Sequence, residues 1–287
     1  MQWWCSAQGI PWEWVWRPYP GVWALVLGLA ASYGLMVRRL APGSAELAGA
    51  RGSAWTPAAP APAGIRVPRR RVESFAAGTL LLWIALDWPV GTLGAGYLAS
   101  VHMVQFLLIS LTAPPLLLYG LPPASLVHLD RGLLGSAARM LTRPVVALLG
   151  FGAVLVATHW PPVVDALMTT QLGSLGFDLA WLGAGLLFWW PIVCPVPERP
   201  GFGAPLKIGY LILATILSTA PYAFLAFGRF PFYSIYELAP RVYGISARAD
   251  QQAAGVIMKV GGGAILWVAI GILFFRWYRA EGGRSAA

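Results

Sequence analysis

Long runs of apolar residues, each about the length of a transmembrane helix, recur along the whole chain. A helix needs roughly 20 mainly apolar residues to cross the hydrocarbon core of a bilayer, and ~17 lies at the short end of the range. Seven segments qualify: residues 19–37, 75–90, 100–119, 144–160, 175–193, 207–227 and 253–277. Prolines such as Pro114 and Pro115 fall inside these runs, which membrane helices tolerate when neighbouring groups satisfy the freed carbonyls. The pattern predicts an all-α, polytopic membrane helix bundle of about seven transmembrane helices.

Composition excludes a soluble two-domain protein, although 287 residues would be long enough for one. Hydrophobic residues make up 58% of the chain and charged residues only 11%, whereas a soluble domain carries about a quarter charged residues. The net charge is +9, which in a soluble protein would suggest nucleic acid. In a membrane protein we interpret it as a topology signal and expect no nucleic-acid partner. The two cysteines, Cys5 and Cys194, exclude a disulfide scaffold.

Basic residues are concentrated in every second loop of the predicted bundle. Fifteen lie on one side: Arg38, Arg39, Arg51, Arg66, Arg69, Arg70, Arg71, Arg131, Arg139, Arg143, Arg199, Lys207, Arg276, Arg279 and Arg284. Four lie on the other, namely Arg17, Arg229, Arg241 and Arg248, and Lys259 falls inside the last span. The positive-inside rule therefore predicts an N-terminus outside and a C-terminus in the cytoplasm. We expect a multi-pass protein of the bacterial cytoplasmic (inner) membrane.

The same pattern divides the chain into five parts. Residues 1–18 hold five tryptophans and predict a segment in the outer headgroup layer. Residues 19–40 form the first transmembrane helix, and residues 41–74, rich in Ala, Pro, Gly and Arg, a flexible cytoplasmic linker. Residues 75–279 form a six-helix membrane core, and residues 280–287 a cytoplasmic tail.

Polar side chains gather where the predicted helices reach the outer face. His102 opens the third span and His159 closes the fourth, and Gln105 and Phe106 share a helix face with His102. Further polar residues on that side are Asp87, Asp165, Asp178, Asp250, Gln251 and Gln252, with Met258 two turns deeper than Asp250. Such a cluster is a candidate ligand or metal pocket, and His102, His159 and Met258 could supply metal ligands if the third, fourth and seventh spans adjoin.

Structural interpretations of these residues stand beside the functional one. Interfacial histidines often serve as hydrogen-bonded anchors, and His128 in a basic loop is expected to be solvated. Asp250 is equally well placed to cap the last span, and Asp87 and Asp165 are equally suited to loops. Methionine more often packs than ligates. Hydrolase, P-loop and dinucleotide-binding motifs are all absent from the sequence, and we expect no enzymatic activity.

Four motifs in order resemble the polytopic CtaG family of cytochrome c oxidase assembly proteins. They are Ser100–Gln105 followed by Ala113–Pro122, Thr158–Pro161 with Asp165, Gly185–Pro191, and Asp250–Met258. The resemblance covers about residues 75–279. It implies a non-catalytic membrane factor for haem-copper oxidase maturation at the copper stage, with copper as its cargo and oxidase subunits as its partners. The positions it carries over are His102, Gln105, His159, Asp165, Asp250, Gln251, Gln252 and Met258.

Two departures from the family pattern bear on metal binding. Many relatives have a histidine where this chain has Phe106, and a Glu-His pair where it has Phe177 and Asp178. Losing these imidazoles weakens a copper site. An accessory or structural subunit of a respiratory membrane complex is therefore the alternative function. A transporter is disfavoured, because the polar groups lie at the outer edge rather than at the midplane.

Overall fold

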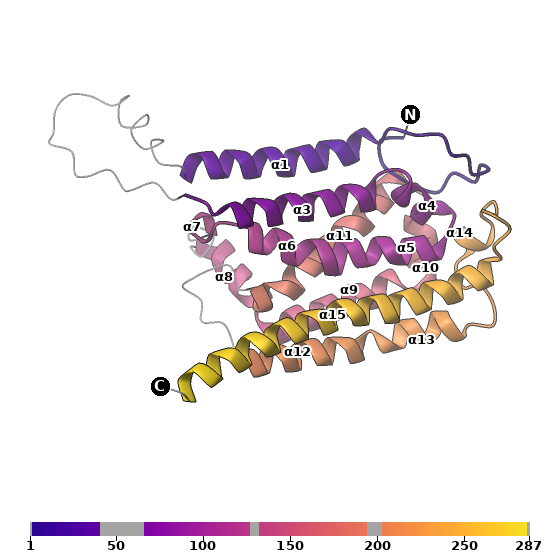
Figure 1. Ribbon diagram of the computed structural model, residues 1–287. Helices are drawn as coiled ribbons and strands as arrows, with labels where there is room; N and C mark the ends of the chain where they lie inside the picture. The colour runs from indigo at the N-terminus through magenta and orange to yellow at the C-terminus, as the bar shows by residue number, and fades with distance from the viewer. Residues whose placement is uncertain (1, 41–65, 127–131, 194–202, 286–287) are drawn as a thin grey trace, which may run out of the picture.

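Every regular element in the described part of the chain is a helix (Figure 1). The computed structural model describes residues 2–40, 66–126, 132–193 and 203–285. The elements are α1 (Pro20–Leu40), α3 (Arg69–Leu86), α4 (Val90–Gly96), α5 (Ala99–Phe106), the π-helical η1 (Leu107–Thr112), α6 (Ala113–Gly120), α7 (Pro123–Leu126), α8 (Gly132–Leu141), α9 (Pro144–Thr158), α10 (Pro161–Leu167), α11 (Gln171–Val193), α12 (Ala204–Leu217), α13 (Thr219–Phe227), α14 (Ser234–Glu237) and α15 (Ala247–Ser285).

The helices confirm the predicted polytopic membrane bundle. Five are long and apolar enough to cross a bilayer: Pro20–Leu40, Ala99–Gly120, Gln171–Val193, Ala204–Phe227 and Ala247–Glu281. Two further pairs pass the same test together but are bent, α3 with α4 by 46° and α8 with α9 by 75°. Counting each bent pair as one span, the described residues supply up to seven spans.

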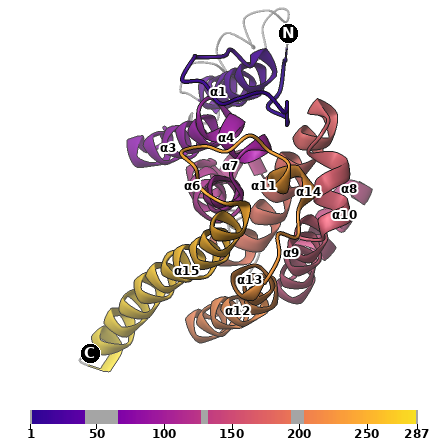
Figure 2. The same ribbon diagram turned by 90° about the vertical axis from the view of Figure 1, so that its right-hand side faces the viewer.

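The span Ala99–Gly120 lies at the centre of the bundle. Two thirds of its most apolar window (67%) is buried, against at most 44% for the other unbent spans. It packs against α3, α11 and α15, and Figure 2 shows α6 surrounded by these neighbours. Side chains on this span therefore reach the protein interior rather than lipid.

A π-helical segment runs through the middle of this central span, directly before Pro114 and Pro115. The prolines have no N–H, so the carbonyls of Ser110 and Leu111, four residues earlier, lose their usual helical partners. Within the segment, Ser110 Oγ donates to the Phe106 carbonyl at 2.6 Å, and Thr112 Oγ1 donates to the Leu107 carbonyl at 3.1 Å. Wide turns of this kind are typical of functional regions of helices.

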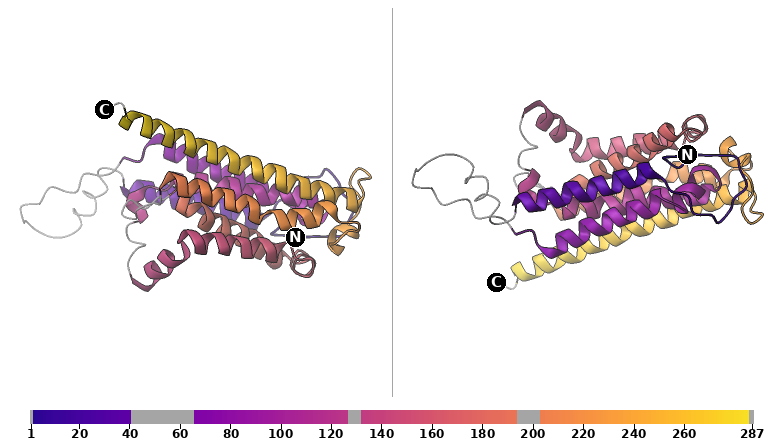
Figure 3. Two further views of the ribbon diagram at one scale, coloured as in Figure 1. Left: turned by 90° about the horizontal axis from the view of Figure 1, so that it is seen from below. Right: turned by 90° about the horizontal axis from the view of Figure 1, so that it is seen from above.

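The two ends of the bundle differ in chemistry. We call one the tryptophan-rich end; it holds residues 2–19, α4, α10 and α14 (Figure 1). The other, the arginine-rich end, holds the end of α1, the start of α3, the α8–α9 bend and the C-terminal part of α15 (Figure 3). The basic residues sort between the ends as the sequence predicts, although Arg51, Arg131 and Arg199 lie outside the described residues. We retain the prediction that the arginine-rich end faces the cytoplasm.

Three features of the structure differ from the predicted division of the chain. Helix α3 begins at Arg69, inside the predicted linker of residues 41–74, of which residues 41–65 are not described. Helix α15 continues to Ser285, through most of the predicted tail. The segment of residues 1–18 does not simply lie in the headgroup layer, because Trp4 and Cys5 are buried within the bundle.

Lys259 remains inside the last span, as predicted, and is hydrogen-bonded there. Its ammonium group donates to the Thr215 carbonyl at 3.2 Å and to Thr219 Oγ1 at 2.7 Å, where α12 gives way to α13. A lysine at membrane depth is costly unless such partners are present.

Candidate functional site

Helix α5 presents His102, Gln105 and Phe106 to the interior at the tryptophan-rich end. Residues three and four apart share a helix face, and all three side chains are buried, each 3% exposed. The face predicted from the sequence is therefore correct, and the central span positions it.

The His102 imidazole lies among aromatic rings and has no hydrogen-bond partner among the described residues. Its ring centroid is 4.7 Å from that of Trp181 and 5.9 Å from those of Phe177 and Tyr236. Neither Nδ1 nor Nε2 is hydrogen-bonded within the described chain. Buried polar groups are normally satisfied, and an unmet one costs about 1–3 kcal/mol. These nitrogens are thus candidates for a ligand, a water or a metal.

His159 follows α9 directly, and its ring is oriented by the backbone. Nδ1 lies 2.7 Å from the Leu155 carbonyl oxygen. Because a carbonyl only accepts, Nδ1 carries the hydrogen and Nε2 holds the lone pair. Nε2 is buried and has no partner among the described residues. This arrangement, with one nitrogen donating to the backbone and the other free, is typical of a metal-ligating histidine.

Gln105 supplies a fourth atom without a partner in the described chain. Its Nε2 donates to Asp178 Oδ1 at 3.1 Å, which leaves Oε1 buried and unbonded within the described chain. A Cβ atom at Gly94 would lie 2.6 Å from Oε1 and 3.2 Å from the His102 Cα, so the glycine lets α4 pack closely against this amide. The other Asp178 oxygen accepts from Trp4 Nε1 at 2.8 Å. Asp178 therefore holds Gln105 and the N-terminal segment in place.

The two histidines occupy one buried region around Phe106 and Trp181. The ring of Phe106 is 5.6 Å from His159 and 5.2 Å from Trp181, and Trp181 also contacts His102. Trp181 is itself anchored, since its Nε1 donates to Thr158 Oγ1 at 3.0 Å.

Met258 lies deeper than this region. It is buried and lines a cavity of about 20 Å³ together with Phe106, Phe151 and Leu155. Phe106 thus contacts His159 on one side and borders the cavity of Met258 on another. The structure places His102, Gln105 and His159 in one buried region around Phe106 and Trp181, while Met258 lines a cavity beside it that Phe106 and Leu155 also line.

Three carboxylates named as site residues act as backbone anchors in the structure. Asp250 accepts from the backbone N–H groups of Ala99 at 2.5 Å and Ser100 at 3.2 Å, and from the Ser100 hydroxyl. It therefore caps α5, not its own helix as the sequence suggested. Asp165 caps α14 in the same way, and Asp87 accepts from the indoles of Trp23 and Trp83 and the N–H of Trp88.

Gln251 secures the loop between α13 and α14. Its Oε1 accepts from the Phe232 N–H at 2.7 Å, and its Nε2 donates to the Phe230 carbonyl at 3.2 Å. Gln252 is half-buried beside it. The described residues contain no group of three or more His, Cys, Asp or Glu side chains that could hold a metal ion.

The sequence did not identify three contributors to the site. Trp4 closes the tryptophan-rich end and bonds to Asp178, Trp181 packs against His102 and Phe106, and Tyr236 donates to the Gly94 carbonyl at 2.6 Å. From the sequence, Trp4 was interpreted only as an interfacial residue. The roles of all three residues depend on contacts between segments far apart in the chain. His128 and Cys194 lie outside the described residues.

The model of the cytochrome c oxidase caa3 assembly factor family (Caa3_CtaG) matches residues 51–280, most of the chain. The chain belongs to this family. The matched range contains His102, Gln105, His159, Asp178, Asp250 and Met258. The family membership expected from the four sequence motifs is confirmed.

Two curated proteins are similar over part of the chain. They are the uncharacterized protein Mb0105 of Mycobacterium bovis and the uncharacterized protein MT0111 of Mycobacterium tuberculosis. Each is 27% identical over 172 residues, covering 52% of this chain and 26% of the relative. The chain thus matches about a quarter of the length of these curated relatives. No solved structure matches the chain.

Proposed function

We propose that this assembly factor passes copper to a haem-copper oxidase through the buried pair His102 and His159. The observation that carries the proposal is the set of buried atoms without partners: both nitrogens of His102, Nε2 of His159 and Oε1 of Gln105. The family supports the assembly role. The donor set supports the cargo, because imidazole nitrogen is a good ligand for copper.

The chemistry of the set suits transfer better than storage. Two imidazoles with a weak amide oxygen form an incomplete coordination shell, which a partner's ligands can complete and then replace. The Leu155 carbonyl fixes the lone pair of His159, and Asp178 fixes the amide of Gln105. The ligands are therefore oriented in advance, which lowers the entropic cost of binding.

The proposed direction of delivery follows from topology. The pair lies at the tryptophan-rich end, which the positive-inside rule places outside the cytoplasm. Copper would then be handed over on the outer side of a bacterial inner membrane, to an oxidase subunit in transient contact. The role is non-catalytic.

A copper titration tests the site. The full-length protein in detergent is titrated anaerobically with Cu(I) against a colorimetric chelator. The double variant His102→Ala/His159→Ala is compared with His128→Ala, which removes the third histidine of the chain. We expect about one Cu(I) per chain in the native protein and His128→Ala, and loss of that copper in the double variant. Equal copper in all three proteins would overturn the proposal.

A test in cells separates delivery from binding. A deletion strain is complemented with each variant, and the copper content and activity of the purified oxidase are measured. We expect His128→Ala to restore both, and the double variant to restore neither. Full oxidase copper with the double variant would refute the delivery role.

One observation favours the alternative, an accessory subunit of a respiratory membrane complex. In the described residues no third His, Cys, Asp or Glu joins the pair, and Asp87, Asp165 and Asp250 serve as backbone anchors. An accessory subunit would co-purify with the complex at fixed stoichiometry and without copper. Copper-dependent, substoichiometric co-purification would exclude it.

A further inference from the structure

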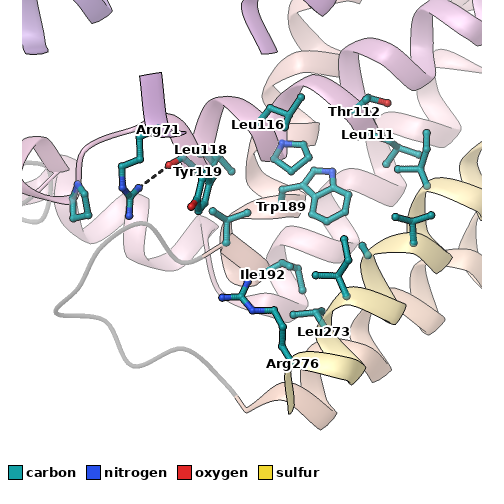
Figure 4. Close-up of a pocket in the computed structure, with 17 residues that line it drawn as sticks. Arg71, Leu111, Thr112, Leu116, Leu118, Tyr119, Trp189, Ile192, Leu273 and Arg276 are labelled. Atoms are coloured by element: carbon teal, nitrogen blue, oxygen red, sulfur yellow. Dashed lines mark hydrogen bonds between the residues drawn. The ribbon is translucent and has the colours of Figure 1, made fainter. Parts of the chain in front are cut away.

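A groove of about 630 Å³ opens between α6, α11 and α15, in the half of the bundle toward the arginine-rich end (Figure 4). Its walls are mainly aliphatic, from residues such as Leu116, Ile192, Ile265, Ile272 and Leu273, with Trp189 deep in the groove. Its volume is typical of a small-molecule site. It lies far from the histidine pair, at the other end of the central span.

The groove is as long as one leaflet of a bilayer. Its lining on α15 runs from Ile265 to Arg276, which at 1.5 Å per residue is about 16 Å. The hydrocarbon core of a bilayer is about 30 Å thick. The length of the groove therefore matches the depth of one leaflet.

Two arginines stand at the surface end of this groove. Arg71 is held in place, because Nη1 donates to the carbonyls of Tyr119 at 2.6 Å and Leu121 at 3.0 Å. Its guanidinium also lies 5.2 Å from the Tyr119 ring centroid. Arg276 is exposed, and Figure 4 shows its guanidinium beside the groove. No acidic residue of the described chain lines the groove, so two positive charges face its mouth.

We propose that this groove binds an anionic phospholipid, with its acyl chains along the apolar walls and its phosphate against Arg71 and Arg276. Arginine pairs with phosphate oxygens through two parallel N–H groups. The end that carries the arginines is the one predicted to face the cytoplasm, where anionic lipids are enriched and basic pockets between helices bind their headgroups. A zwitterionic lipid also carries a phosphate, but its ammonium group offsets that charge, so an anionic headgroup complements the two arginines better.

Arg276 provides the cleaner variant, because Arg71 also holds the backbone of residues 119–121. Arg276→Gln removes one charge at the mouth. The control Arg279→Gln removes the same charge one turn further along α15, outside the groove. Ala269→Trp fills the groove from its wall and leaves both arginines unchanged.

The experiment exposes the full-length protein in mild detergent to phosphatidylglycerol or phosphatidylcholine, and counts retained lipid by native mass spectrometry. We expect the native protein and Arg279→Gln to retain one phosphatidylglycerol and little phosphatidylcholine. We expect Arg276→Gln to weaken retention about tenfold, and Ala269→Trp to abolish it. Circular dichroism checks that each variant is folded.

Two outcomes would overturn the proposal. One is equal retention of both lipids by the native protein. The other is equal loss of phosphatidylglycerol in Arg276→Gln and Arg279→Gln. Neither outcome depends on copper, so the lipid site and the proposed function fail or succeed independently.

Discussion

Asp250 gives the most informative single perturbation, because it was named as a site residue and the structure makes it an anchor for the helix that carries His102. Helix α5 begins after Leu98, whose side chain cannot cap it. Asp250, far away in sequence, accepts the N–H groups of Ala99 and Ser100 and the Ser100 hydroxyl, and is itself 3% exposed.

The magnitude follows from those bonds. Replacing Asp250 with alanine leaves two backbone N–H groups without an acceptor, one of them fully buried. Each such group costs about 1–3 kcal/mol, so we expect a loss of about 3–5 kcal/mol. Losses of this size are exceptional among single substitutions. Asp250→Asn keeps one acceptor and should lose about half as much.

Asp165→Ala is the matched control. Asp165 also caps a helix through two backbone N–H groups, those of Ser234 and Ile235, but at a half-buried position where one of the bonds is exposed. Exposed caps contribute about 1 kcal/mol. The assay is thermal unfolding of each variant in the same detergent, combined with the Cu(I) titration. If the Asp250→Ala protein is no less stable than the Asp165→Ala protein, the anchor role is refuted. If the Asp250→Ala protein loses copper but keeps the stability of the native protein, Asp250 acts as a copper ligand instead.

The remaining predictions concern three other positions. Phe106→His places a third imidazole one turn from His102 and beside His159. It should tighten Cu(I) binding about tenfold in the same competition titration. Unchanged affinity would mean that copper does not bind beside these two histidines. Burial raises the pKa of the Cys5 thiol, which disfavours the reactive thiolate. In a Cys194→Ser protein, where Cys5 is the remaining cysteine, maleimide at pH 7–8 should therefore label the thiol only after denaturation. Rapid labelling of the folded protein would contradict this burial. A Cβ at position 185 would lie 2.3 Å from a carbonyl oxygen of η1, whereas one at 183 meets nothing within 4 Å. Gly185→Ala should therefore lose about 1–3 kcal/mol in thermal unfolding while Gly183→Ala does not, and equal stability of the two would refute this close packing.

The membrane architecture was predictable from the sequence alone, because it depends on local properties. Apolar runs of about 20 residues must be helical in lipid, where the backbone has no other source of hydrogen bonds. The sorting of arginines between alternate loops likewise follows from the order of residues. The shared face of His102, Gln105 and Phe106 required only helical periodicity.

The partners of the polar side chains were decided by tertiary structure. Asp250 looks like a cap for its own helix because it begins that helix, yet its carboxylate caps α5. Trp4 looks like an interfacial anchor, yet it enters the bundle and bonds to Asp178. Contacts between residues more than 100 positions apart depend on how helices pack, and the pattern along one helix does not encode them.

The candidate site shows the same division. The sequence by itself determined which side chains carry imidazole, amide and thioether donors, and at which end of which helix they lie. Only the tertiary structure decided that His102, Gln105 and His159 share one buried region, that the backbone orients His159, and that Met258 lies beyond Phe106. The physical reason is that ligand chemistry belongs to single residues, whereas a site needs several of them in one place with their other hydrogen bonds already assigned.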